Sequence, residues 1–275
     1  KTTLSGDGFR MVFDDATGGL ESYQAKGVEL LTAPLRLNFW RPPTNNDGGA
    51  KLNEKLKVWQ TAGSGAKVTK ATVEPAGKHT RVHYELDLPA GNSKAVIDYQ
   101  IASSGVLGVT VTVDVAKDQP MLPRLGMQAE MPASFRTWKW FGKGPHENYW
   151  DRQDGAWVGE FTGSVDDLFH RYVDPQESGN RCEVRHAGFS NPEGSGLKIE
   201  ALGDSLLEIA AYPFKPDNIQ SARHPVDLQP ANTTIHIDLH QMGLGGTDSW
   251  GATALDRYQL KPGNTYTYAF SLAPL

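Results

Sequence analysis

The stretch I-H-I-D-L-H-Q-M-G-L-G-G-T-D-S-W-G, residues 235 to 251, contains the two patterns on which the fold prediction depends. Its first six residues alternate apolar and polar side chains, which is the period-2 pattern of a half-buried β-strand. Three glycines follow within four positions, at 243, 245 and 246. Glycine permits positive φ and close approach to the backbone, but it loses more conformational entropy on folding than other residues. A loop with this many glycines is therefore expected to do more than connect two strands.

The same loop presents Asp248, Ser249 and Trp250 just before a further glycine. Two interpretations fit an indole at this place. The tryptophan could close one end of a β-sandwich as part of its core, where large aromatic side chains are usually found. Alternatively, the indole could stack on the apolar C–H face of a sugar while its polar neighbours bind the hydroxyl groups. The residues alone leave both interpretations open.

Period-2 alternation recurs from one end of the chain to the other and predicts many strands. The clearest segments are 81–88, 109–115, 197–200 and 265–272. The turn sequence D-D-A-T-G-G at 14–19 predicts a hairpin between Phe9–Phe13 and Leu20–Tyr23. The 29 glycines and 17 prolines exceed the usual share, which fits a chain with many turns.

A helical pattern is convincing only over Lys51–Thr61, where Leu52, Leu56 and Trp59 fall on one face. No internal repeat or linker-like stretch interrupts the strands. We therefore predict one all-β domain over residues 1–275, a large antiparallel β-sandwich with long loops.

The net charge argues against several classes of partner, and the cysteine content excludes an internal disulfide. The net charge of −5, with scattered basic residues, argues against nucleic acid or an anionic membrane as the main partner. Cys182 is the only cysteine, so no internal disulfide can form, and we expect a small buried side chain there. No apolar run is long enough to span a bilayer, and the N-terminal K-T-T-L lacks the apolar core of a signal peptide. Cytoplasm and periplasm both stay open as compartments.

The segment R-P-P-T-N-N-D-G-G at 41–49 follows an apolar strand and has no helix or strand pattern of its own. Its prolines and its Asn-Asn-Asp-Gly-Gly run indicate an irregular loop. Arg41, Asn46 and Asp47 are candidates for the rim of a binding site. Alternatively, Arg41 and Asp47 form an ion pair that fixes the loop to the sandwich.

Two loops of similar composition carry one glutamate each. G-K-G-P-H-E-N-Y-W-D-R at 142–152 contains Glu147, and Y-V-D-P-Q-E-S-G-N-R-C at 172–182 contains Glu177. Glycoside cleavage usually needs two carboxylates that face one another, so this pair is a catalytic candidate. The structural alternative is a set of ion pairs that anchor the loops. In that alternative the arginines Arg152 and Arg181 bind Glu147 and Glu177, or else Asp151 and Asp174.

The histidines form no metal-binding motif. His236 and His240 share one face of the predicted strand but lie about 13 Å apart on it, too far to share a metal ion. The G-L-G-G run at 243–246 lacks the strand–glycine–helix context of a dinucleotide-binding loop.

Four motifs, in order, give the chain a resemblance that covers essentially its whole length. F-W-R-P-P-T-N-N-D-G-G, the 142–152 and 172–182 loops, and H-Q-M-G-L-G-G-T-D-S-W resemble the C-terminal "small chain" domain of family 2 glycoside hydrolase β-galactosidases. The resemblance implies a supersandwich fold related to galactose mutarotase. It also implies that the acid/base and nucleophile glutamates belong to a separate (β/α)₈ barrel, which leaves no catalytic residue in this chain. Because the resemblance runs to Leu275, we expect the chain to be the C-terminal domain of a longer protein.

The resemblance assigns roles to particular residues. Trp250 would stack on the substrate, with Asp248 and Ser249 shaping its loop, and Gly49–Asn53 would match a mobile loop of the cleft. The implied partners are a galactoside substrate, the preceding domains of the same chain and a second copy of the enzyme. The parent enzymes use Mg²⁺ and Na⁺ in other domains, so no cofactor is expected here.

Two other functions stay open at this stage. A stand-alone mutarotase would need an acid and a base, for which His146 and either Glu147 or Glu177 are candidates. A carbohydrate-binding module would use exposed tryptophans, of which the chain has seven to offer.

Overall fold

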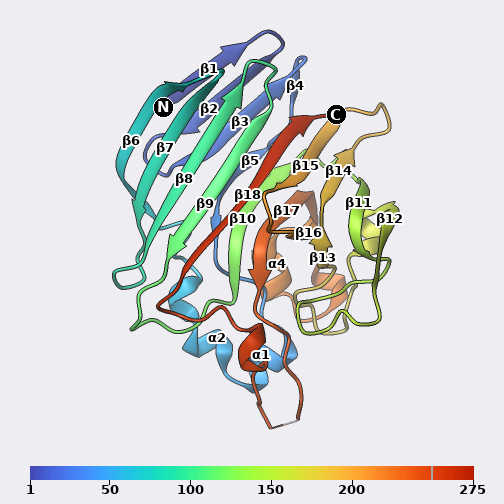
Figure 1. Cartoon of the computed structure of the whole chain (residues 1–275). Coiled ribbons are helices and arrows are strands. Elements are labelled where there is room, and N and C mark those ends of the chain that lie inside the picture. Colours follow the sequence, from blue (N-terminus) through green and yellow to red (C-terminus); the bar gives the residue numbers. More distant parts are fainter. Residues whose placement is uncertain (249) are drawn as a thin grey trace.

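The computed structural model describes residues 1–248 and 250–275, which form two antiparallel sheets of nine strands each (Figure 1). The first sheet has the strand order β1 (Thr2–Gly6), β2 (Phe9–Asp14), β3 (Gly19–Ala25), β5 (Ala33–Asn38), β10 (Arg124–Met131), β17 (Pro230–Gln241), β16 (Leu207–Phe214) and β13 (Arg181–Val184), with β4 (Val28–Glu29) paired to β3. The second has the order β12 (Trp157–Ser164), β11 (Thr137–Gly144), β14 (His186–Ser190), β15 (Gly196–Leu202), β18 (Thr265–Pro274), β9 (Leu107–Asp114), β8 (Lys94–Ala102), β7 (His79–Asp87) and β6 (Lys67–Ala76). The predicted antiparallel sandwich is confirmed.

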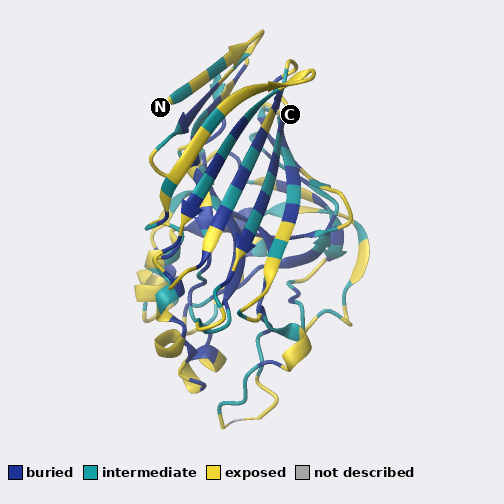
Figure 2. Ribbon diagram, turned by 60° about the vertical axis from the view of Figure 1, so that its left-hand side comes forward, coloured by how far each residue is buried: buried dark blue, intermediate teal, exposed yellow. Residues whose placement is uncertain are grey.

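The core lies between the two sheets, and the predicted alternation places its side chains. Figure 2 shows buried and more exposed positions alternating along the strands of the second sheet. On β9, Val109 and Val111 face inward opposite Phe270 and Tyr268 of β18. Each fully buried side chain of this kind contributes about 1.5–3 kcal/mol to folding. The hydroxyl of Tyr268 donates to the carbonyl of Ile237 at 2.9 Å and so links the two sheets.

Two local predictions are confirmed and one is wrong. The hairpin of β2 and β3 forms, and the predicted helical segment folds as α2 (Leu52–Lys55) and the 3₁₀ turn η1 (Lys57–Trp59). The 41–49 segment, however, contains a short helix, α1 (Asn45–Gly49). Thr44 and Asp47 form a capping box at its start, which supports a helix in spite of the two glycines.

Strand β17 also departs from its prediction, because it is buried on both faces rather than half-buried. All residues from 233 to 239 are buried, including His236 and Asp238. A register shift against β10 leaves Leu239 unpaired, so the regular alternation between His236 and His240 is broken. The polar face of this strand therefore faces other protein groups instead of water.

The remaining short elements lie in the connections between strands. They are α3 (Val165–Leu168), α4 (Pro216–Ser221) and the 3₁₀ turns η2 (Pro225–Asp227) and η3 (Asp256–Tyr258). Phe169, Phe214 and Ile219 form a second, smaller apolar cluster under α4. In the described part of the chain, no helix is long and apolar enough to cross a membrane.

Candidate functional site

The glycine loop, residues Met242 to Gly251, leaves the end of β17 and is fixed at its base by the 41–47 segment. The guanidinium of Arg41 donates two hydrogen bonds to Asp47, with Nε 3.0 Å from Oδ2 and NH2 2.9 Å from Oδ1. Its third nitrogen donates to the carbonyl of Met242 at 2.8 Å. Because Arg41 and Asp47 are both buried, the structural alternative for this pair is confirmed. A bidentate pair of this kind also fixes the relative orientation of the two side chains, because the planar guanidinium matches the geometry of the carboxylate.

Two further side chains bind the same base. The amide of Asn46, exposed at the protein surface, donates to the carbonyl of Leu244 at 3.1 Å. The carboxylate of Asp151 accepts from the backbone amides of Leu244 and Gly245, at 2.8 and 2.9 Å. At Gly243 a Cβ would lie 2.6 Å from that carboxylate, so this close approach requires glycine.

The end of strand β17, which leads into the glycine loop, is held in place by contacts of His240. The ring of His240 stacks on Trp150 with centroids 4.2 Å apart and an angle of 8° between the planes. Its Nδ1 lies 2.9 Å from Oε1 of the buried Glu208. The indole, the imidazole and the carboxylate therefore fix where the glycine loop begins.

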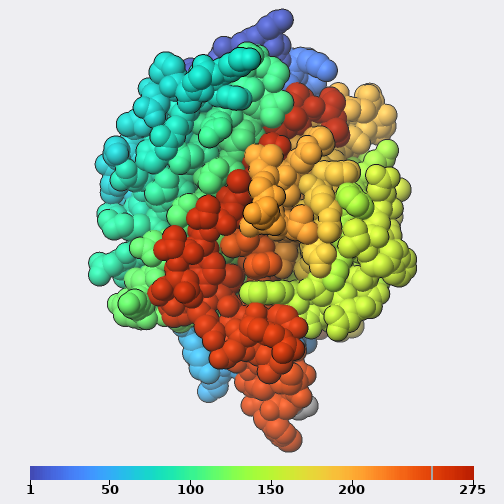
Figure 3. All heavy atoms as spheres, in the orientation of Figure 1, coloured from blue at the N-terminus to red at the C-terminus, as the bar shows by residue number. Residues whose placement is uncertain are grey.

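The tip of the loop, in contrast, projects from the molecule (Figures 1 and 3). Asp248 accepts hydrogen bonds from the amides of Ala252 and Trp250, and these bonds lower the pKa of its carboxyl. The side chain of Trp250 is 90% exposed. The interpretation of this tryptophan as part of the core is therefore wrong. Ser249 lies outside the described residues.

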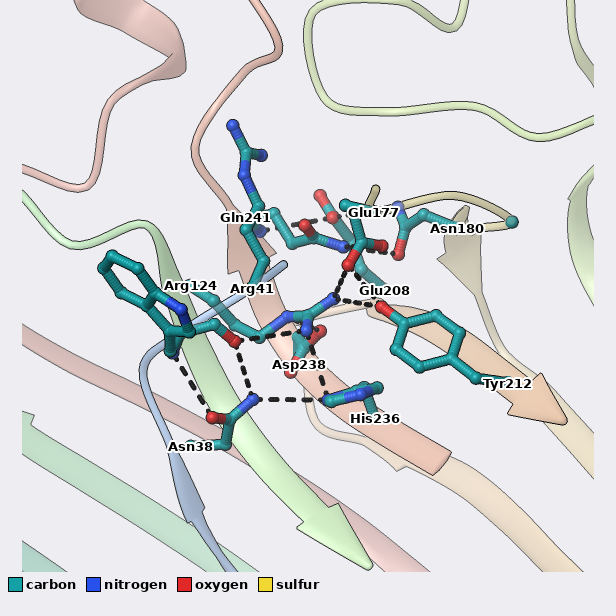
Figure 4. A network of polar contacts seen from close by, with 12 residues as sticks. Asn38, Arg41, Arg124, Glu177, Asn180, Glu208, Tyr212, His236, Asp238 and Gln241 are labelled. Atoms are coloured by element: carbon teal, nitrogen blue, oxygen red, sulfur yellow. Dashed lines mark hydrogen bonds and ion pairs between the residues drawn. The ribbon is translucent and has the colours of Figure 1, made fainter. Parts of the chain in front are cut away.

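A buried polar cluster lies on the outer face of the first sheet, next to the base of the loop (Figure 4). Its members are Arg124, Glu177, Tyr212, His236, Asp238 and Gln241. Arg124 is its centre: Nε lies 3.0 Å from Asp238, NH2 lies 3.2 Å from Glu177, and NH1 lies 3.2 Å from Nδ1 of His236. The hydroxyl of Tyr212 donates to Glu177. The cluster ties the 172–182 loop to strands from three parts of the sequence.

Burial sets the charge state of this cluster. Burial raises the pKa of Asp238 well above its usual value, although the neighbouring Arg124 opposes this shift. Burial and the same guanidinium hold the pKa of His236 well below 6.5, so this imidazole is neutral. Gly126 of β10 makes room for the carboxylate, because a Cβ there would lie 1.8 Å from Oδ1 of Asp238.

The two glutamates considered for catalysis are engaged elsewhere. Glu147 accepts from the Gly179 amide, the Tyr172 hydroxyl and Arg152. Burial raises the pKa of this carboxyl, but these donors outweigh burial and hold it below the usual value. Glu177 is only 2% exposed and is held in the buried polar cluster. Neither has the free, accessible carboxyl that a general acid or base needs.

The predicted ion pairs of these loops are confirmed in part. Glu147 pairs with Arg152 at 2.7 Å, as the structural alternative proposed. The pairing of Arg181 with a carboxylate is wrong, since its guanidinium packs over the rings of Trp138 and Trp140, at 5.5 and 5.0 Å from their centroids. Planar guanidinium groups pack well on aromatic faces.

Arg124 and Tyr212 are members of the cluster that sequence reasoning missed. The residues next to each of them in the sequence are apolar, and neither belongs to one of the four motifs. A weak signal was available at Asp238, a carboxylate between Ile237 and Leu239 that must find a partner if the strand is buried on both faces.

The two large sheets define a galactose mutarotase-like sandwich. A putative aldose 1-epimerase from Escherichia coli K12 has this fold, with a TM-score of 0.53 and 13% identity over 99% of this chain and 98% of the other. A galactose 1-epimerase from Lactobacillus acidophilus NCFM is also similar, with a TM-score of 0.54 and 11% identity over 99% and 93% of the two chains. At these identities the likeness concerns the fold alone.

Within this class the chain belongs to the β-galactosidase small chain family, whose model matches residues 5–272. The β-galactosidase of Priestia megaterium is 35% identical over 99% of this chain and 26% of that protein. The β-galactosidase of Streptococcus thermophilus is 32% identical over 99% of this chain and 27% of that protein. The chain thus spans about a quarter of the length of these relatives, and this share implies further domains in the same polypeptide.

Proposed function

We propose that this chain is one domain of a retaining β-galactosidase that hydrolyses terminal β-D-galactosyl residues. The catalytic glutamates lie in a barrel domain outside these residues, and the glycine loop completes the substrate cleft. The observation that carries the proposal is Trp250, an indole 90% exposed at the end of a loop whose base is fixed by buried groups. Family membership supplies the activity, because the relatives named above are β-galactosidases.

The geometry of the glycine loop suits a sugar. An exposed indole offers a flat apolar face for the C–H side of a pyranose. Asn46 and Asp248 near the base and tip offer polar groups for hydroxyls. Because hydrogen bonds to Arg41 and Asp151 already order the base, less conformational entropy is lost when a ligand binds.

A stand-alone mutarotase is not favoured, because Glu147 and Glu177 are engaged in structural contacts and His146 has no free carboxylate partner among them. A carbohydrate-binding module remains an alternative with the same Trp250 surface. For the whole enzyme, the proposal also includes contacts between this domain and the preceding domains of the same chain and assembly with a second copy. Mg²⁺ and Na⁺ would bind in the other domains.

Two activity measurements test this proposal. Hydrolysis of p-nitrophenyl β-D-galactopyranoside is measured for the 275-residue chain and for the longer protein that contains it. We expect hydrolysis only from the longer protein. We also expect polarimetry of freshly dissolved α-galactose to give the same mutarotation rate with and without the 275-residue chain. Hydrolysis or faster mutarotation by the chain alone would contradict the assignment of its carboxylates to structural roles.

A further inference from the structure

A cavity lies on the outer face of the first sheet, and no residue of the glycine loop lines it. It measures about 250 Å³ and is walled by β5, β10, the start of α4 and the 60–64 segment. Its lining is mostly polar, and the groups that matter are Arg36, Trp40, Gln128, Glu130, Lys215 and Asp217. None of them belongs to the base or the tip of the glycine loop.

The strand register explains why polar side chains gather there. Leu35 and Leu37 of β5 are buried in the core, so Arg36 between them points to the opposite face. Gln128 of β10 is the direct partner of Arg36 across the two strands, and Glu130 follows it on the same face. The cavity therefore has a floor of adjacent polar side chains on rigid strands.

Several of these side chains have unused hydrogen-bonding capacity. Among the described residues, Arg36 and Gln128 make no side-chain hydrogen bond or ion pair, and Glu130 has only Lys215 at 4.0 Å. Gln128 and Glu130 are half-buried on the rigid floor and Arg36 is exposed beside them. Polar groups in a cavity that lack protein partners are available to a ligand.

The aromatic wall is held in place. The indole of Trp40 donates from Nε1 to Gln220 of α4 at 2.9 Å. The backbone carbonyl of Trp40 accepts from Asn38 at 3.0 Å, and the same amide lies 3.3 Å from Nδ1 of His236 in the buried polar cluster. These contacts connect the buried polar cluster to Trp40 and hold the wall of the cavity in place. Little conformational entropy is therefore lost at this wall when a ligand binds.

Charge and size narrow the class of ligand. The cations Arg36 and Lys215 are balanced by the carboxylates Glu130 and Asp217, so a phosphate or carboxylate ligand gains no net attraction here. The volume is below the roughly 300–1,000 Å³ of pockets that take drug-sized ligands. A single ring with several hydroxyl groups and one apolar C–H face fits both the polar floor and the indole wall.

We propose that this cavity binds one neutral hexopyranose, and we name it the β5–β10 sugar site. It is a second sugar site in the chain, separate from Trp250, and it takes a ring between the floor of Arg36 and Gln128 and the indole of Trp40. The proposal stands on this cavity alone and does not depend on the β-galactosidase activity of a longer protein.

The test is titration of the 275-residue chain with methyl β-D-galactopyranoside and with D-glucose, followed by calorimetry and saturation-transfer NMR. All measurements use a Trp250→Ala background, so that the glycine loop cannot supply the signal. Arg36→Ala and Gln128→Ala are the site variants. Arg10→Ala is the matched control, because Arg10 is another exposed arginine on a strand of the same sheet and lies outside the cavity. Circular dichroism and thermal unfolding establish that each variant is folded.

We expect at least one of the two sugars to bind in the Trp250→Ala background. Loss of a hydrogen bond to a charged group then weakens binding about tenfold or more in Arg36→Ala, while Arg10→Ala binds as the parent does. We expect a measurable loss in Gln128→Ala as well, and no binding of the open-chain polyol sorbitol. The absence of binding by either sugar, or equal affinity in the site variants and in the control, would overturn the proposal.

Discussion

At the scale of single residues, the buried polar cluster is the most demanding feature of the molecule. Arg124 carries its charge inside the protein, where an unpaired charge is costly, and only Asp238, Glu177 and their neighbours offset that cost. As one alternative, the sequence predicted that Glu177 forms a loop-anchoring ion pair with Arg181, and that partner is wrong. The true partner, Arg124, is 53 residues away along the chain, and no local pattern connects the two positions.

The close contact at Gly126 gives the first prediction. Gly126→Ala places a methyl group against the carboxylate and the Cα of Asp238, so either the ion pair or the strand pairing must shift. We expect the free energy of unfolding, measured with urea, to fall by about 3 kcal/mol or more. Gly48→Ala is the control, since a Cβ there meets no atom within 4 Å and its effect stays within about 1 kcal/mol. Equal effects of the two substitutions would contradict the steric account.

The neutral, buried His236 makes stability depend on pH. Below pH 6.5 the unfolded chain binds a proton at this imidazole and the folded chain does not, so acid favours unfolding. We expect the free energy of unfolding to fall from pH 7 to 5 by up to about 1.4 kcal/mol per pH unit from this group. Asp238, whose pKa is raised, contributes with the opposite sign and is present in every variant.

The control isolates the imidazole. His236→Asn places an amide near the position of Nδ1 but removes the titrating ring. The difference in unfolding free energy between wild type and variant should therefore change between pH 7 and 5, in the direction of a greater acid loss for the wild type. Parallel pH profiles for the two proteins would contradict the prediction, because they would show that His236 is protonated equally in the folded and unfolded states.

At the scale of secondary-structure elements, prediction succeeded where one period extends over many residues. Strands β7, β9 and β18 alternate regularly, so these strands and their core faces followed from the sequence. Prediction failed at α1, because two glycines in five residues mask a helix that Thr44 and Asp47 stabilise from its first turn. It failed again at β17, where the polar half of the alternation is buried against Arg124 of the neighbouring strand.

The α1 segment yields a prediction of its own. Asp47→Ala removes the capping carboxylate and also leaves Arg41 buried without its ion-pair partner. We expect a loss of about 3–5 kcal/mol in unfolding free energy, against about 1 kcal/mol for Thr44→Ala, which removes the cap alone. Asp256→Ala breaks the exposed pair with Lys261 and serves as the control, with an expected loss below about 1 kcal/mol.

The same variants report on the glycine loop. Arg41 also binds the carbonyl of Met242, so the loop base should loosen in Asp47→Ala. Limited proteolysis should then cut between residues 242 and 251 faster than in Thr44→Ala. Identical cleavage rates would contradict the role of Arg41 as the link between the two segments.

At the scale of the whole molecule, the sandwich brings together segments that the sequence separates widely. Asn46, Asp151 and Leu244 meet at the base of one loop, and Asn38, Arg124 and His236 meet on one sheet face. These contacts depend on the order of strands within the sheets, which periodicity does not specify. The four motifs identified the family, and exposure of Trp250 became evident only from the structure.

We propose that Trp250 of this domain forms part of the substrate cleft of a longer β-galactosidase. The most direct test is steady-state hydrolysis of lactose by that longer protein, as wild type, as Trp250→Ala and as Trp157→Ala. Trp157 is the matched control, a tryptophan 60% exposed on β12 and outside the glycine loop.

Loss of one aromatic contact of roughly 1–3 kcal/mol raises KM about 5-fold to 150-fold in Trp250→Ala. We expect this increase for Trp250→Ala and an unchanged KM for Trp157→Ala. An unchanged KM in Trp250→Ala, in a protein that is folded and active, would contradict it.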